Sequence, residues 1–295
     1  MEKFKSFITE AKEEDYRVVV LSVEHGDKAI TSKRIKEESD KLGLANYVIP
    51  LDGANLSYDK TYKIHEAGDE KGFDISPSDT VVFVRGTPSR DSSLDLISEL
   101  EKIGICCVNP RLTINMAADK FRTYIKLKDY GLTQPKTVLI PNQDELESAV
   151  KKLDTKFPII MKTLRGSKGV GVLFIESERA LTSIVQLMYK TDSSSDLLIQ
   201  EYIKSEFDVR VIVLGGKIVG TMQRDVVEGD FRSNYSQGAK VKSYKLSDLE
   251  TEQCLLSAKA LDGILTAVDF IPSANPKTAP PFILEVNSSP GSLGQ

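Results

Sequence analysis

The stretch IIMKTLRGSKGVGVLFIES, residues 159–177, decides the fold of the second half of the chain. A glycine-rich segment, GSKGVG, lies between two apolar runs, and Lys162 precedes its first glycine, Gly166, by four residues. The Walker and dinucleotide patterns open a helix, but the residues that follow this segment, VLFIES, are typical of a strand. The sequence therefore predicts a β-hairpin whose tip carries Gly166, Gly169 and Gly171.

Glycines at such a tip let backbone N–H groups approach phosphate oxygens closely, because no Cβ stands in the way. Lys162, at the end of the first strand, could place a positive charge against the same phosphates. A flexible hairpin with a surface lysine is the competing interpretation, and the glycine spacing alone does not separate the two.

Three oxygen-bearing residues near the C-terminus favour the phosphate interpretation. Asp269 lies in AVDFIP, and Glu285 and Asn287 lie in LEVNSS, on predicted neighbouring strands. Glu285 and Asn287 are two positions apart, so they project from one face of a strand. Their oxygens suit Mg²⁺. Zinc is disfavoured, because the chain has only two histidines and its cysteines lack the spacing of zinc ligands. A paired, half-buried polar spot is the alternative, but burying acids without a charge partner is costly, which favours a metal.

Length and composition are those of a globular chain. Its 295 residues correspond to about two domains, and 40% are hydrophobic and 28% charged. A net charge of −4 gives no indication of a basic surface, so we expect no direct nucleic-acid binding. No apolar run is long enough to span a membrane and the N-terminus lacks a signal pattern, so we expect a cytoplasmic protein. Cys106, Cys107 and Cys254 lack metal or disulfide spacing, which predicts buried thiols.

The two halves of the chain differ in their pattern of predicted strands and helices. The first half alternates strand-like and helical patterns, which predicts a parallel α/β sheet. The strands are expected at 17–24, 45–51, 80–86 and 105–110, and the helices at 30–43 and 92–104. Between them, residues 52–79 are expected to be a long loop with one short hairpin at most.

From Leu112 onward the patterns predict a mixed α+β region. One helix is expected over 114–131, and a strand hairpin should turn at Gly215 and Gly216. We therefore predict three units: an N-terminal α/β domain over 1–111, a central unit with the glycine-rich lid over 112–199, and a C-terminal unit with the metal site over 200–295.

The ordered set of motifs resembles the ATP-grasp superfamily and, within it, the ribosomal-protein-modifying glutamate ligases, the RimK-like family. The resemblance is carried by ADKFRTYIKLKDYGL, IIMKTLRGSKGVGV, IQEYIKSEFDVRVIV, EGDFRSN and AVDF…FILEVNSSPG. It runs in order from about Asp79 to Gln295, and the N-terminal region fits more loosely. It implies an N-terminal α/β (pre-ATP-grasp) domain followed by a two-subdomain ATP-grasp fold.

The resemblance also implies a role for each site residue, with ATP and Mg²⁺ as cofactors, two ions expected and Mn²⁺ as a substitute. For the phosphates and the lid the residues are Lys120, Lys162, Gly166, Ser167, Gly169 and Gly171. For adenine and ribose they are Gln200, Glu201, Tyr202, Ile203 and Asp208. For the metal they are Asp269, Glu285 and Asn287. For phosphoryl transfer they are Arg224, Lys162 and Arg210, and for the carboxylate substrate Arg232, Ser233 and Asn234.

Each of these residues has a simpler alternative. Lys120, on a helix rich in Lys and Arg, could be solvated, and Glu201 could be an ordinary loop polar group, as could Asp208. Arg210 or Arg224 could be a cross-strand salt-bridge partner, and Tyr202 could serve in packing. Only the ordered set favours the nucleotide site.

The implied reaction joins a carboxylate to an amine at the expense of ATP. Phosphoryl transfer gives an acyl phosphate, which the amine attacks to leave an amide, ADP and phosphate. Such a site needs cations and a lid that excludes water, not a nucleophilic Ser, Cys or His. The expected partners are an amino acid such as glutamate and a carboxylate on a peptide or protein C-terminus, within a homo-oligomer. A ligase for a small metabolite and a non-catalytic ATP-binding scaffold are the alternatives.

Overall fold

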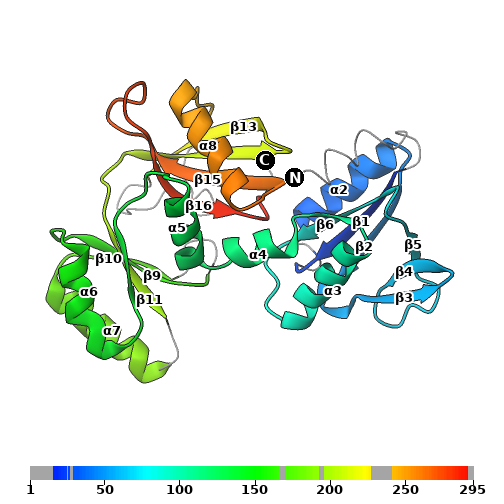
Figure 1. Ribbon diagram of the computed structural model, residues 1–295, viewed down its shortest axis with the longest axis horizontal. Coiled ribbons are helices and arrows are strands. Elements are labelled where there is room, and N and C mark those ends of the chain that lie inside the picture. The colour runs from blue at the N-terminus through cyan, green and yellow to red at the C-terminus, as the bar shows by residue number, and fades with distance from the viewer. Residues whose placement is uncertain are drawn as a thin grey trace.

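The structure is a computed structural model that describes residues 16–24, 26, 29–166, 171–192, 196–226 and 241–291. Three larger sheets follow one another along the chain, and a small sheet is inserted in the first unit. Figure 1 shows the N-terminal sheet at the right, the central sheet at the lower left and the C-terminal sheet at the upper left. No helix in this part of the chain combines the length and the apolar character that crossing a bilayer requires.

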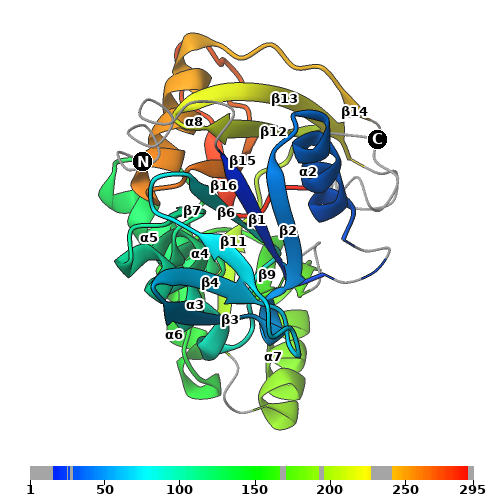
Figure 2. The same cartoon turned by 90° about the vertical axis from the view of Figure 1, so that its right-hand side faces the viewer.

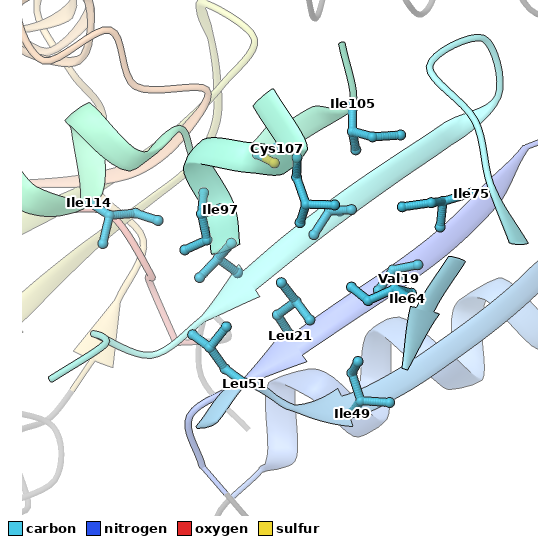
Figure 3. Close-up of a cluster of buried hydrophobic side chains, with 13 residues drawn as sticks. Val19, Leu21, Ile49, Leu51, Ile64, Ile75, Ile97, Ile105, Cys107 and Ile114 are labelled. Carbon is cyan, nitrogen blue, oxygen red and sulfur yellow. The ribbon is translucent and has the colours of Figure 1, made fainter. Parts of the chain in front are cut away.

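The N-terminal sheet is parallel, with the strand order β2-β1-β6-β7, which confirms the predicted α/β unit. Helices α2 and α3 connect its strands, as parallel pairing requires. Val19, Leu21 and Ile97 belong to one buried cluster that also contains the Cys107 thiol (Figure 3). All three cysteines are buried, as predicted. The elements are β1 (Arg17–Ser22), α2 (Ile30–Lys41), β2 (Ala45–Pro50), β6 (Thr80–Arg85), α3 (Asp91–Lys102) and β7 (Cys106–Val108).

Residues 52–79 are not the long loop that the sequence predicts. After the short 3₁₀ turn η3 (Leu51–Gly53), they form an antiparallel sheet of β3 (Asn55–Asp59), β4 (Thr61–His65) and β5 (Phe73–Ile75). Ile64 and Ile75 from this sheet lie in the buried cluster of the N-terminal unit. Strands β3 (NLSYD) and β4 (TYKIH) alternate apolar and polar residues, so the sequence does carry a strand signal here, although each strand is at most five residues long.

The helix predicted over 114–131 is two helices, α4 (Arg111–Ala117) and α5 (Lys120–Asp129). Asp119 interrupts it because its carboxylate accepts hydrogen bonds from the N–H groups of Phe121 and Arg122 and so caps α5. The cap places Lys120 in the first turn of α5, which is where the chain passes from the N-terminal sheet toward the central one (Figure 1).

The central sheet is antiparallel, with the order β10-β9-β11-β8. Strand β10 follows the glycine-rich segment directly and pairs with β9, with Val172 opposite Lys162, which confirms the predicted hairpin. Helices α6 and α7 bury Leu153 and Val185 against the sheet. Strand β11 extends past residue 199 to Glu201. The elements are β8 (Thr137–Ile140), η4 (Gln143–Glu145), α6 (Leu146–Leu153), β9 (Ile159–Thr163), β10 (Val172–Ile175), α7 (Glu178–Thr191) and β11 (Leu197–Glu201).

The C-terminal sheet has the order β14-β13-β12-β15-β16, with every pair antiparallel. The β12–β13 hairpin turns at Gly215 and Gly216, whose φ angles of 57° and 80° suit glycine, so the predicted turn is confirmed. Helix α8 starts with a capping box between Ser247 and Glu250 and packs against the sheet. The elements are β12 (Phe207–Leu214), β13 (Lys217–Asp225), β14 (Val241–Lys242), α8 (Asp248–Ala260), β15 (Leu265–Ile271) and β16 (Phe282–Asn287).

Asn109 joins the N-terminal unit to the C-terminal sheet. Its amide nitrogen donates to the carbonyls of Leu265 and Ser288 at 2.6 and 2.5 Å. Its amide oxygen accepts from the N–H groups of Ile264 and Leu265 at 2.7 and 3.0 Å. Asn109 is only 1% exposed, so these hydrogen bonds are shielded from solvent. Figure 2 shows the two sheets that this residue connects one behind the other.

We predict that Asn109→Ala lowers the free energy of unfolding by roughly 3 kcal/mol or more, because it leaves several buried backbone groups without partners. Urea denaturation followed by circular dichroism measures the change. Asn46→Ala is the matched control, because Asn46 is only half-buried and bonds Asp40 and Leu44 near the surface, so its effect should stay below about 1 kcal/mol. An unchanged urea midpoint for Asn109→Ala would contradict the assignment.

Candidate functional site

A cleft of about 830 Å³ opens between the three larger sheets. The predicted site residues that line it are Lys120, Lys162, Gly166, Gln200, Glu201, Tyr202, Ile203, Asp208, Arg210, Arg224, Asp269, Glu285 and Asn287. Gly171 precedes Val172, which also lines the cleft. The predicted residues Ser167, Gly169, Arg232, Ser233 and Asn234 lie outside the part of the chain that the structure describes.

The base of the glycine hairpin is held close to helix α5. Gly171 has a φ of 81°, and a Cβ there would come within 2.3 Å of the Thr163 hydroxyl oxygen, so this position requires glycine. The Lys120 backbone N–H donates to the Leu164 carbonyl at 3.1 Å, and Lys120 Nζ donates to the Gly166 carbonyl at 3.2 Å. The first glycine of the hairpin therefore lies beside a lysine from another element.

Lys162 points its ammonium group at a neutral partner. Its Nζ donates to Gln200 Oε1 at 2.7 Å, and Gln200 Nε2 in turn donates to Thr137 Oγ1 at 2.7 Å. Burial lowers the pKa of Lys162 to about 8; the Glu285 carboxylate opposes this shift and the Lys120 ammonium adds to it. An anion that enters the cleft would stabilise the protonated form of a lysine held in this way.

Lys120 is a second cation of the same kind. Burial lowers its pKa, with Glu285 and Asp119 acting in the opposite direction. The Lys120 and Lys162 ammonium groups come from different elements and repel each other, as the lowering of the Lys162 pKa by Lys120 shows. Lys120 thus lies in the cleft wall and is hydrogen-bonded to the hairpin, and its phosphate-binding role stays a prediction.

The segment after β11 forms one wall of the cleft. The Glu201 N–H donates to the Lys136 carbonyl at 2.8 Å, and Glu201 Oε2 accepts from the Lys136 N–H at 3.2 Å. Tyr202 packs edge-on against Phe174, with ring centroids 5.0 Å apart, which supports its packing role. Ile203 adds an apolar surface to the wall. The adenine-facing role of these residues stays a prediction.

Alternating charges cross four neighbouring strands of the C-terminal sheet. The register places Asp208 opposite Arg224, Arg210 opposite Asp269, and Asp269 opposite Glu285. Arg224 Nε and Nη2 donate to the two Asp208 carboxylate oxygens at 2.7 and 2.8 Å. Arg210 Nε and Nη2 donate to the two Asp269 oxygens at 2.7 and 2.5 Å. We call these residues the charge ladder; both arginines are cross-strand salt-bridge partners, and the Asp208 carboxylate faces Arg224.

Asp269 is the most enclosed acid of the charge ladder. Arg224 Nη2 lies 3.0 Å from its Oδ2, in addition to the bidentate pair with Arg210. Burial alone would raise the pKa of Asp269, but the Arg210 and Arg224 guanidiniums hold it well below its usual range. Asp269 is therefore ionised at neutral pH although it is buried.

The donor set on β15 and β16 fits a hard divalent cation. Asp269 lies opposite Glu285, and Ala267 lies opposite Asn287, so all three predicted ligands lie on one face of the strand pair. Asn287 Nδ2 donates to Glu285 Oε1 at 3.0 Å, and the Glu285 side chain is 42% exposed toward the cleft. The described residues contain no group of three or more His, Cys, Asp or Glu side chains that could hold a metal, so an amide oxygen would have to complete the set.

The sequence did not reveal the wall that the N-terminal unit contributes. Glu24, after β1, and Thr87 and Ser89, after β6, line the cleft, together with residues 288–291 after β16. The Gly86 N–H donates to Ser289 Oγ at 2.7 Å. Ligands of parallel sheets bind beyond the carboxyl ends of adjacent strands where the strand order reverses, so the loops after β1 and β6 could have been singled out from the predicted sheet.

Two α+β units that clasp a cleft, one bringing a glycine hairpin and two lysines and the other an acidic strand pair, define an ATP-grasp protein. A sequence profile of the RimK-like ATP-grasp domain matches residues 117–295. The chain therefore belongs to the RimK-like ATP-grasp family.

Individual proteins agree with this assignment. The chain is 34% identical over 201 residues to a probable alpha-L-glutamate ligase of Coxiella burnetii, a match that covers 68% of this chain and 64% of that protein. It is 28% identical over 280 residues to the probable alpha-L-glutamate ligase 2 of Pseudoalteromonas atlantica, covering 94% and 89% of the two chains. The fold is that of the ATP-grasp ligase PsnB complexed with a minimal precursor, Mg and ADP, with a TM-score of 0.65, 18% identity, and 93% and 90% coverage.

We predict that Glu285→Ala reduces Mg²⁺-dependent ADP release by at least about a hundredfold, because it removes the exposed carboxylate of the donor set. The fold should persist, since this side chain is 42% exposed. Coupled-enzyme measurement of ADP checks the loss, and thermal unfolding checks the fold. Glu252→Ala, on the exposed face of α8, is the control that should keep normal turnover. Near-normal ADP release from Glu285→Ala would rule out the metal assignment.

Nucleotide affinity should also depend on pH. Below a pH of about 8, Lys162 carries its proton and affinity should be level; above it, binding must take up a proton and should weaken by up to about tenfold per pH unit. Calorimetric titration with a non-hydrolysable ATP analogue between about pH 6.5 and 9.5 measures this. Lys162→Gln should bind weakly with no such dependence. A flat profile for the wild-type protein would place Lys162 away from the phosphates.

Proposed function

We propose that this protein is an ATP-dependent carboxylate–amine ligase that forms an amide bond through an acyl phosphate and releases ADP and phosphate. The observation that carries the proposal is the meeting of two weakly partnered lysines, Lys120 and Lys162, with the acidic strand pair of Asp269 and Glu285 across one cleft. Cations on one side and hard oxygen donors on the other are what a bound metal–nucleotide complex requires.

Each side of the cleft has a separate task. Lys120 and Lys162 neutralise phosphate oxygens, and the glycine hairpin between β9 and β10 closes over them and excludes water. Asp269, Glu285 and Asn287 would hold Mg²⁺, which supplies positive charge to the phosphoryl oxygens. The similar ligase PsnB forms a complex with Mg and ADP, which supports a metal–nucleotide complex in this cleft.

The arginines of the charge ladder act on the group being transferred. Both arginines line the cleft, and the Arg210 side chain is 24% exposed whereas that of Arg224 is 4% exposed. Both can lower the energy of negative charge that moves from ATP to the acceptor carboxylate. No Ser, Cys or His nucleophile is required, because the acceptor itself attacks the phosphorus and the amine then attacks the acyl carbon.

The acceptor and the amino acid would bind beyond the charge ladder. There the cleft continues to Thr87 and Ser89 of the N-terminal unit and to residues 288–291. We place the predicted carboxylate-binding segment of Arg232, Ser233 and Asn234 in this role as well. The names of the Coxiella and Pseudoalteromonas relatives support glutamate as the amine, and we propose a peptide or protein C-terminal carboxylate as the acceptor.

We expect one oxygen of an ¹⁸O-labelled acceptor carboxylate to appear in the released phosphate, because the acyl phosphate transfers that oxygen when the amine attacks. A short peptide with a labelled C-terminal carboxylate, L-glutamate and ATP are incubated with the protein, and phosphate is examined by mass spectrometry. Hydroxylamine in place of glutamate should trap a hydroxamate. The same peptide with a C-terminal amide is the control and should support no ADP release.

Two outcomes would overturn the mechanism. Unlabelled phosphate accompanying the amide product would exclude the acyl phosphate, and release of pyrophosphate with the labelled oxygen in AMP would indicate adenylation. ADP release that ignores amino acids and acceptors altogether would favour an ATP-binding scaffold. Activity with small-metabolite carboxylates but not with peptides would move the acceptor to the other ligase class.

A further inference from the structure

The carboxylate of Asp269 is already occupied by guanidinium groups. Its Oδ1 accepts from Arg210 Nε at 2.7 Å, and its Oδ2 accepts from Arg210 Nη2 at 2.5 Å and lies 3.0 Å from Arg224 Nη2. A carboxylate offers about four lone-pair positions, so most of those on Asp269 are taken. A divalent cation that binds Asp269 would therefore meet two positive groups on the same carboxylate.

The two arginines are held unequally. Arg224 has a carboxylate of its own, Asp208, in a bidentate pair at 2.7 and 2.8 Å, and its side chain is only 4% exposed. Arg210 has Asp269 as its bidentate partner, and its next acid, Glu285, lies 3.9 Å away. Both arginines line the cleft, but the Arg210 side chain is 24% exposed, so Arg210 is the one that can leave Asp269 without moving out of a closed core.

Asp269 and Glu285 need a cation between them in every state. They lie opposite each other on β15 and β16, where two like charges repel. Arg210 supplies that cation in the arrangement described here, since its guanidinium reaches both carboxylates. A metal ion on the same oxygens would satisfy the same need and would repel Arg210 at the same time.

We propose that Arg210 is an exchangeable cation: it neutralises Asp269 and Glu285 when no metal is bound, and metal binding releases its guanidinium to the anionic substrate in the cleft. This proposal rests on the proposed function, because it requires that a metal ion binds at Asp269 and Glu285. The released side chain stays within the cleft, across from Lys120 and Lys162, where phosphoryl or carboxylate oxygens give it a new bidentate partner. Metal binding and recognition of the reacting anion are then coupled through the movement of the Arg210 side chain.

The test compares Mn²⁺ binding to nucleotide-free wild-type protein, Arg210→Gln and Arg210→Lys, using the electron paramagnetic resonance signal of free Mn²⁺. Arg210→Gln should bind Mn²⁺ at least about tenfold more tightly than the wild type, because the competing charge is gone. Its ADP release should nevertheless fall by at least about a hundredfold, because the charge that meets the substrate is gone too. Arg210→Lys keeps the charge but not the bidentate geometry, and its Mn²⁺ affinity should lie between the other two.

Arg111→Gln is the matched control, because Arg111 forms a surface pair with Asp95 at 3.3 Å and should leave Mn²⁺ binding unchanged. Equal or weaker Mn²⁺ binding by Arg210→Gln would overturn the exchange. If that variant does not fold, the comparison of Arg210→Lys with the wild type decides in the same way. A non-hydrolysable ATP analogue should tighten Mn²⁺ binding more in the wild type than in Arg210→Gln, and equal tightening would contradict the exchange. Because Mn²⁺ binding needs no turnover, a protein without ligase activity would still answer the question.

Discussion

The buried carboxylate of Asp269 is the constraint on which the C-terminal sheet and its site depend. An ionised acid that is 3% exposed is tolerable only with opposite charges in contact, and two guanidiniums provide them. Those guanidiniums come from β12 and β13, while Glu285 comes from β16, so the contacts hold only in one register of four strands. A shift of one residue in any of these strands would turn a charged side chain to the wrong face.

On the opposite side of the cleft, the cations donate hydrogen bonds to neutral groups and not to carboxylates. Lys120 and Lys162 bond to a carbonyl and to a neutral amide, and burial lowers the pKa of both. The C-terminal side thus carries charges that are matched within the protein, whereas the side formed by β9 and α5 holds cations whose nearest hydrogen-bond partners are neutral. An anion with several negative oxygens would restore the balance by binding between these cations.

Local patterns were enough to predict much of this arrangement. The strand after the glycine segment identified a hairpin, and the two-residue spacing of Glu285 and Asn287 identified a shared face. The sheet in residues 52–79 was missed although β3 (NLSYD) and β4 (TYKIH) alternate apolar and polar residues, because the strands have five residues or fewer and β3 is mostly exposed. The break at Asp119 had a signal, an N-cap residue, that a continuous apolar pattern concealed. The partners of Asn109 lie about 155–179 residues away and are backbone atoms, so no side-chain pattern records them.

That last feature bears on how such proteins can diversify. The amide of Asn109 recognises only the carbonyls and N–H groups of residues 264, 265 and 288, and Thr113 likewise donates to the carbonyls of Leu261 and Asp262. Every amino acid except proline offers the same backbone groups, so the receiving surface can drift in sequence without losing the attachment. Attachment through backbone groups therefore allows the N-terminal wall of the cleft to change in sequence without disturbing the residues proposed to hold phosphate and metal.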